Sequence, residues 1–144
     1  QPCFDELWGG SSGLYSTRLG AERALALNRC GELAAAGVPL AFGSDTPVTA
    51  LGPWAAVRAA AHHHDPTASL DPLAAFDAHT RAAWVAGGVD DEGVLAPGRP
   101  ATFAIWRTQV LAPGPTPLPD LRPDADLPEC VTTVLRGRTL HDAG

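Results

Sequence analysis

The sequence has no methionine, and all ten of its basic residues are arginine. A translated chain begins with methionine, whereas this one opens at Gln1, so we expect a processed or partial chain. The missing lysine accompanies a bias toward alanine and arginine, which is typical of a GC-rich coding sequence. We therefore assign no chemistry to the absence of lysine.

Long apolar runs are also missing. No segment approaches the roughly 20 apolar residues that a membrane-spanning helix needs, and no basic segment precedes an apolar signal sequence. The net charge of −6 disfavours binding to nucleic acid or to an anionic membrane. Hydrophobic residues make up 45% of the 144 residues and charged residues 18%, so we expect one domain with a packed core.

Cysteine is scarce. Cys3, Cys30 and Cys130 are far apart, odd in number and form no CxxC pair, so their spacing indicates neither a disulfide framework nor a metal site. Reduced thiols of this kind are typical of a cytosolic protein, and we expect a cytoplasmic location.

The first half of the chain predicts a loop, a helix and a buried strand. Residues 1–19 are rich in glycine and serine and predict a loop. Residues 20–36 predict a helix, with Gly37 as its left-handed C-terminal cap. The apolar run 38–42 is continuous and does not alternate, which is typical of a strand covered on both faces.

Two further helices and a β region follow. We expect one helix from Pro53 to about residue 63 and another over residues 71–86, with Ser69 or Asp71 as its cap. Residues 112–128 are rich in proline and predict an irregular connector. Strands are predicted over residues 102–106, 130–135 and 139–141, the last two joined by a turn at 136–138.

Asp45 is the sharpest candidate for chemistry. It follows the predicted buried strand, and catalytic groups of α/β proteins gather where strands end. A carboxylate in that place can hold a metal ion or act as a base. The structural alternative is that Asp45 caps the next helix or closes an Asx turn. The residues alone leave both interpretations open.

The histidines and the acidic cluster favour structural roles. His62, His63 and His64 are adjacent on a helix, so their side chains point about 100° apart and cannot converge on one ion. We interpret this tract as the exposed end of the helix and His79 as a hydrogen-bonded helix residue. The run 90–92, two aspartates and a glutamate, predicts a solvated charge cluster. No dinucleotide, P-loop or hydrolase-elbow motif is present.

Several segments together resemble one family. GVPLAFGSDTPV, the Pro53-Trp54 helix start, LDPLAAFDAHTRAAW and GVLAPGRPATFAIW follow one another in this order. They are similar to the C-terminal part of amidohydrolase family 3, a family of metal-dependent hydrolases that includes N-substituted formamide deformylase-like enzymes. The resemblance covers nearly the whole chain.

This resemblance implies an α/β fold, namely the C-terminal part of a TIM (β/α)8 barrel of the metal-dependent hydrolase type plus short β segments of a composite β-sandwich. Residues 1–92 would form the barrel portion, with its last strand at about 38–42, and residues 93–144 the sandwich segments. The implied activity is hydrolysis of a C–N bond, in an amide or N-formyl group, by metal-activated water.

The resemblance also assigns site residues. Asp45 matches the aspartate at the end of the last barrel strand, which implies metal contact and general-base catalysis, with zinc as the expected metal of the full-length enzyme. Apart from this match, our candidates for contact with a small amide-type substrate are Ser44, Thr46 and, in the aromatic loop around Phe4, Trp8.

The chain also departs from the family. The HxH motif, the bridging Lys or Glu and the later His ligands are absent, and Ala101-Thr102 stands where Ala-Asp is usual. We therefore expect the isolated chain to be inactive, to bind no zinc tightly, and to need the missing N-terminal part of the barrel or to self-associate. The alternatives are a non-catalytic structural or interaction domain and a truncated gene product.

Overall fold

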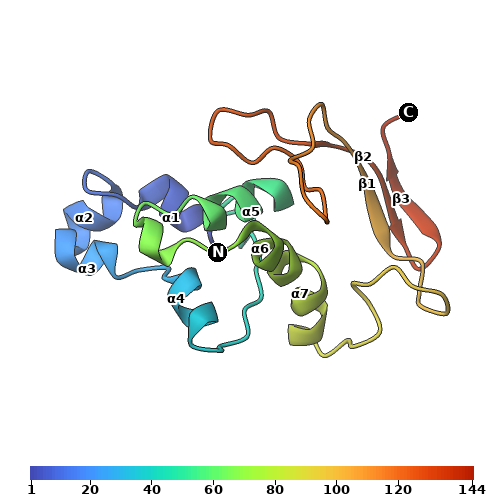
Figure 1. Cartoon of the computed structure of the whole chain (residues 1–144), viewed down its shortest axis with the longest axis horizontal. Coiled ribbons are helices and arrows are strands. Elements are labelled where there is room, and N and C mark those ends of the chain that lie inside the picture. The colour runs from blue at the N-terminus through green and yellow to red at the C-terminus, as the bar shows by residue number, and fades with distance from the viewer.

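The computed structural model describes all residues 1–144, with the helices at one end of an elongated molecule and the strands at the other (Figure 1). None of the helices combines the length and apolar character needed to cross a membrane. The elements in chain order are α1 (Cys3–Trp8), α2 (Leu14–Leu19), α3 (Ala21–Leu25), α4 (Cys30–Ala35), α5 (Pro53–Ala61), the short 3-10 helix η1 (Pro66–Ala68), α6 (Pro72–His79), α7 (Arg81–Ala86), β1 (Phe103–Arg107), β2 (Glu129–Leu135) and β3 (Arg138–Asp142).

Helices α5 and α6 carry the main core. The predicted helix start at Pro53 is confirmed. Proline is tolerated at the first position of a helix because the backbone N–H that it lacks would have no partner there. Val57 is buried, and the proline-rich connector returns Leu118 and Leu121 onto the same cluster. The connector is irregular, as predicted, yet it supplies part of the core.

The helix predicted over residues 71–86 is two helices, α6 and α7. The chain breaks at Thr80, with φ −117° and ψ −97°, and the hydroxyl of Thr80 donates to the Phe76 carbonyl at 2.8 Å. The predicted cap is confirmed, because the Asp71 carboxylate accepts the N–H groups of Leu73 at 2.9 Å and Ala74 at 3.2 Å.

The helix predicted over residues 20–36 is also divided, into α3 and α4. Asn28 adopts a left-handed φ of 53° between them, a conformation that asparagine tolerates better than most residues. The C-terminal cap is confirmed: Gly37 has φ 77°, and its N–H donates to the Ala34 carbonyl at 2.9 Å.

Residues 1–19 are not the predicted loop but contain α1 and α2. Only the stretch 9–13 is irregular. Phe4 and Trp8, one helical turn apart in α1, have ring centroids 4.7 Å apart, a pairing that stabilises a short helix.

The strand predicted over residues 38–42 is wrong. The segment belongs to no sheet, and Val38 is 44% exposed. Its two backbone hydrogen bonds go to helices, from the Val38 N–H to the Leu33 carbonyl at 3.0 Å and from the Phe42 N–H to the Ala78 carbonyl at 2.8 Å. A strand exists only when a neighbour pairs with it, and no other segment of the 144 residues forms a ladder here. The apolar run instead places Phe42 in the helical core.

The three strands form one antiparallel sheet in the order β1-β2-β3. Arg136 and Gly137, with φ 50° and 79°, make the tight turn between β2 and β3, as two left-handed residues in a hairpin do. The predicted strands are confirmed within about two residues. The predicted β segments are thus present, whereas the structure contains no parallel pair of strands. The barrel portion stays a prediction, and so does the domain boundary between residues 92 and 93.

Candidate functional site

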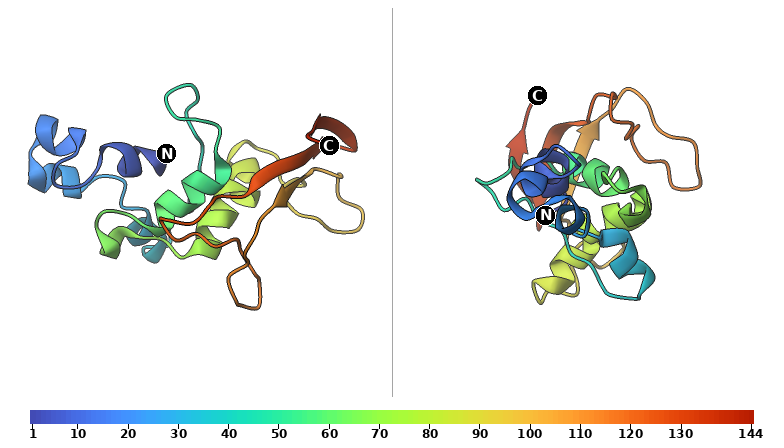
Figure 2. Two further views of the ribbon diagram at one scale, coloured as in Figure 1. Left: turned by 90° about the horizontal axis from the view of Figure 1, so that it is seen from above. Right: turned by 90° about the vertical axis from the view of Figure 1, so that its left-hand side faces the viewer.

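Asp45 lies on an exposed loop between residue 43 and α5. Seen from above (Figure 2, left), this loop projects away from the helices. The Asp45 carboxylate is exposed and accepts no hydrogen bond, and its backbone has a left-handed φ of 56°. Gly52, not Asp45, is the cap residue of α5. The structural alternative, in which Asp45 caps the helix or closes an Asx turn, is therefore not what the structure shows.

Hydroxyl groups hold the Asp45 loop from within. Thr49 donates to the Ser44 carbonyl, Thr46 donates to the Thr49 carbonyl at 2.9 Å, and the hydroxyls of Ser44 and Thr46 are 3.0 Å apart. The Val48 N–H closes the loop on the Asp45 carbonyl at 2.8 Å. Ser44 and Thr46 thus shape the loop that presents Asp45, and their contact with a substrate stays a prediction.

Trp8 lies on α1, where its ring packs on Phe4 and, edge-on, on Tyr15 with centroids 6.0 Å apart. Neither the cavity that runs along residues 37–41 nor the cavity between α5 to α7 and the sheet is lined by Trp8 or by residues 44–46. These two cavities therefore do not bring the predicted substrate residues together.

No group of three or more His, Cys, Asp or Glu side chains is placed to hold a metal ion. The three cysteines are free, and burial raises the pKa of the Cys3 and Cys30 thiols, which keeps them protonated. A catalytic zinc needs three protein ligands, and Asp45 supplies one carboxylate. The residues of this chain do not by themselves fit a divalent ion.

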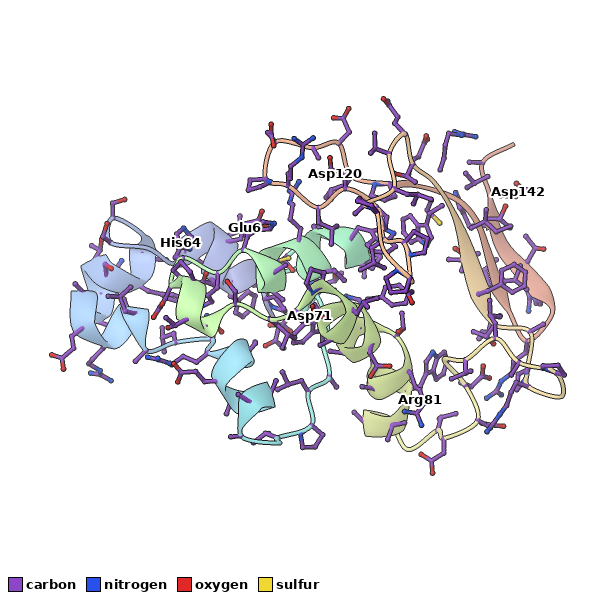
Figure 3. All side chains as sticks on the ribbon, viewed as in Figure 1. Glu6, His64, Asp71, Arg81, Asp120 and Asp142 are labelled. Carbon is purple, nitrogen blue, oxygen red and sulfur yellow. The ribbon has the colours of Figure 1, made fainter.

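A buried carboxylate–imidazole cluster lies where α1 meets the end of α5. Asp5 is 3% exposed; its Oδ1 is 3.2 Å from His63 Nε2, and its Oδ2 is 3.0 Å from both His64 Nδ1 and the His64 backbone N–H. The prediction of a fully exposed histidine tract is wrong for His63, which is buried, while His64, labelled in Figure 3, stays exposed.

Backbone groups hold the His63 ring in place. The Asp65 N–H donates to His63 Nδ1 at 2.9 Å, and the Asp65 carbonyl lies 3.1 Å from the same nitrogen. The other ring nitrogen, Nε2, faces Asp5 and the Leu27 carbonyl, each at 3.2 Å. A Cβ on Gly10 would lie 2.8 Å from the His64 ring, so glycine is required there. The Ser69 hydroxyl lies beside the cluster and accepts from the His63 backbone N–H at 3.2 Å. The cluster acts as a clamp between segments 59 residues apart.

A second ion pair joins the helical part to the sheet. Glu92 is 2% exposed, and its Oε1 accepts from Arg136 Nε at 2.6 Å. The Thr102 hydroxyl and the Arg136 guanidinium hold the pKa of the Glu92 carboxyl below its ordinary value. The prediction of a solvated cluster is therefore wrong for Glu92, since the hairpin turn that covers it lies 44 residues further along the chain.

Two cavities border the helices of the chain. One of about 590 Å³ runs along residues 37–41 and is lined by α4, α6 and α7. The other, of about 900 Å³, lies between the helices α5 to α7 and the sheet. In neither cavity do acid, base and nucleophile converge as in an assembled active site.

Comparison with known proteins gives the family. Residues 1–141 match the family model described as the amidohydrolase family. The chain belongs to this family, and the match supports membership of amidohydrolase family 3. No curated protein and no solved structure matches the chain.

Family membership supports the general part of the predictions on activity, fold and metal. It supports a hydrolase of the amidohydrolase superfamily, suggests a TIM-barrel-type fold, and brings the expectation of a divalent metal, which family members usually use. The formamide deformylase-like subtype, the bond that is cleaved and the identity of the metal go beyond what the match supports.

Proposed function

We propose that residues 1–144 are part of an enzyme that hydrolyses a C–N bond in a small amide or N-formyl compound, with Asp45 as the catalytic carboxylate. The observation that carries this proposal is that a chain of the amidohydrolase family presents the Asp45 carboxylate to solvent. Its carboxylate is exposed and free of hydrogen bonds, on a loop that its own hydroxyl groups hold in shape.

In the proposed reaction, water attacks the carbonyl carbon of the amide, and Asp45 accepts a proton from that water as the new C–O bond forms. The proton then passes to the amine nitrogen as the C–N bond breaks. Ser44 and Thr46 hold the shape of the loop that carries Asp45, and Trp8 offers an aromatic surface for the substrate. Zinc contact at Asp45 is part of the proposal, and it requires ligands from outside this chain.

The proposed partner is either the N-terminal part of the barrel or a second copy of the chain. The segment 38–42 is extended but lies in no sheet, and an apolar cavity of about 590 Å³ runs along it. Unpaired extended backbone beside apolar surface is where another strand can add. We expect the missing elements of the active site to be supplied there.

A non-catalytic interaction domain is the second candidate, because no three metal-ligating side chains come together in the chain. The two candidates differ in chemistry. The protein that carries these residues at its natural length, offered N-formyl and acyl-amide compounds, should release amine. If no amine is released from any of these compounds, with or without zinc, the enzyme proposal is wrong and the interaction domain is favoured.

A further inference from the structure

The cavity of about 900 Å³ between the helices and the sheet has aromatic walls. The rings of Trp54 and Phe76 stack, with centroids 5.4 Å apart and planes 16° from parallel, and Trp106 meets Trp54 edge-on at 6.2 Å. All three rings line the cavity, Trp54 and Phe76 from α5 and α6 and Trp106 from β1. The volume lies within the range of about 300 to 1,000 Å³ that is usual for small-molecule sites.

A buried hydrogen-bond donor among these rings has no partner. Trp54 is only 8% exposed, and its indole Nε1 makes no hydrogen bond within the chain. Buried indole N–H groups in proteins nearly always find an acceptor, because leaving the donor unpaired is costly. An acceptor from outside the chain would satisfy it.

His79 adds a second polar group to the lining of the cavity. Its ring makes no hydrogen bond to another residue, and burial lowers its pKa, so the imidazole is neutral near pH 7. The predicted helix position of His79 is confirmed, whereas no hydrogen bond joins its ring to another residue. Arg81, labelled in Figure 3 at the start of α7, and Asp77 also line the cavity; their charges are opposite, so neither sign of ligand charge is favoured.

We propose that this cavity is a binding site for a small uncharged aromatic molecule with a carbonyl oxygen, whose ring packs among Trp54, Phe76 and Trp106 while its oxygen accepts the Trp54 Nε1–H. Aromatic rings favour stacked and edge-on neighbours, and the orphaned donor selects for an acceptor beside the ring. Asp45 does not line this cavity, so the binding site does not depend on the proposed hydrolytic function.

Two probes of matched shape test the role of the donor. Acetophenone carries an aromatic ring and a carbonyl oxygen, and cumene has nearly the same shape without an acceptor. We expect saturable binding of both to the 144-residue chain, with acetophenone about three- to tenfold tighter. Among the four indole N–H signals in proton–nitrogen correlation spectra, that of Trp54 should move downfield with acetophenone only.

Two variants locate the interaction. Trp54→Phe keeps an aromatic ring and removes the N–H, so it should bind the two probes equally. Tyr15→Phe, which removes a hydrogen-bond donor from an aromatic ring outside the cavity, should retain the preference for acetophenone. The proposal is overturned if neither probe saturates, if the unmodified chain binds both equally, or if the Trp8 signal moves in place of the Trp54 signal. The probe comparison needs no variant, so it stands even if Trp54→Phe fails to fold.

Discussion

Two aspartates show how differently one residue type is used in this chain. Asp5 is buried against two imidazoles, whereas Asp45 is exposed and free of hydrogen bonds. Asp45 could be found from the sequence because its signal is local, an acid directly after an apolar run. Asp5 could not be found, because its partners His63 and His64 lie almost 60 residues away and nothing local marks the contact.

The first prediction concerns the clamp around Asp5. Replacing Asp5 by alanine leaves the His64 backbone N–H without its acceptor and removes the carboxylate beside the buried His63 ring. Asp5→Ala should therefore lower the free energy of unfolding by about 2 kcal/mol. Urea denaturation measures this. Asp45→Asn is the control at the exposed carboxylate, and because asparagine tolerates the left-handed φ of 56° it should change stability by less than about 0.5 kcal/mol. Equal losses in the two variants would remove the distinction between a structural and an available carboxylate.

At the scale of helices and strands, neighbouring residues in the sequence were sufficient to predict where helices begin and end and where the hairpin turns. Pro53, Asp71 and Gly37 were predicted from their own neighbourhoods, and so was the hairpin turn at Arg136 and Gly137. The breaks at Asn28 and Thr80 were missed because helix-forming residues, mainly alanine and leucine, continue on both sides of them. The prediction of a strand over residues 38–42 was wrong because a strand forms only when another segment pairs with it, and nothing local in the sequence shows whether one does.

The second prediction concerns the cap of α6. Asp71→Ala removes the acceptor for two backbone N–H groups and should cost about 1 kcal/mol of stability. Urea denaturation again measures the effect. Asp77→Ala, at an exposed carboxylate of the same helix without a hydrogen bond, should change stability little. A loss at Asp77 as large as that at Asp71 would contradict the capping role.

The third prediction concerns the link between helices and sheet at Glu92. Its pKa is lowered in the folded state, so its contribution to stability is present above its unfolded value of about 4.5 and is lost as pH falls through the folded value. Thermal melts from about pH 5 down to about pH 3 should show a steeper loss for the unmodified chain than for Glu92→Gln. Parallel curves would mean that the pair with Arg136 does not contribute.

At the scale of the whole molecule, the chain exposes more surface than a compact monomer of its mass. Its accessible surface is 8806 Å², whereas a compact monomer of 14.9 kDa exposes about 7,000 Å². Only 23 of 144 residues are buried, so the core is small for the length of the chain. Composition predicted a core but could not show this, because the same apolar residues serve either an internal core or a surface that another chain covers.

The fourth prediction follows from this uncovered surface. The 144-residue chain should self-associate as its concentration rises, and light scattering should show it. Val38→Lys places a charge on the unpaired segment and should reduce association, whereas Leu51→Lys, at a leucine that is 80% exposed on the Asp45 loop, should not. A monodisperse monomer that melts cooperatively in calorimetry would favour an independent domain.

The rate of amide hydrolysis by the Asp45→Asn variant, in the protein at its natural length, tests the catalytic role of Asp45 most directly. The amide of asparagine cannot accept the proton, so kcat should fall by about a hundredfold or more, while the exposed Asp124→Asn control keeps the unmodified rate. An unchanged kcat in Asp45→Asn, with hydrolysis intact, would contradict the assignment of Asp45 as the catalytic carboxylate.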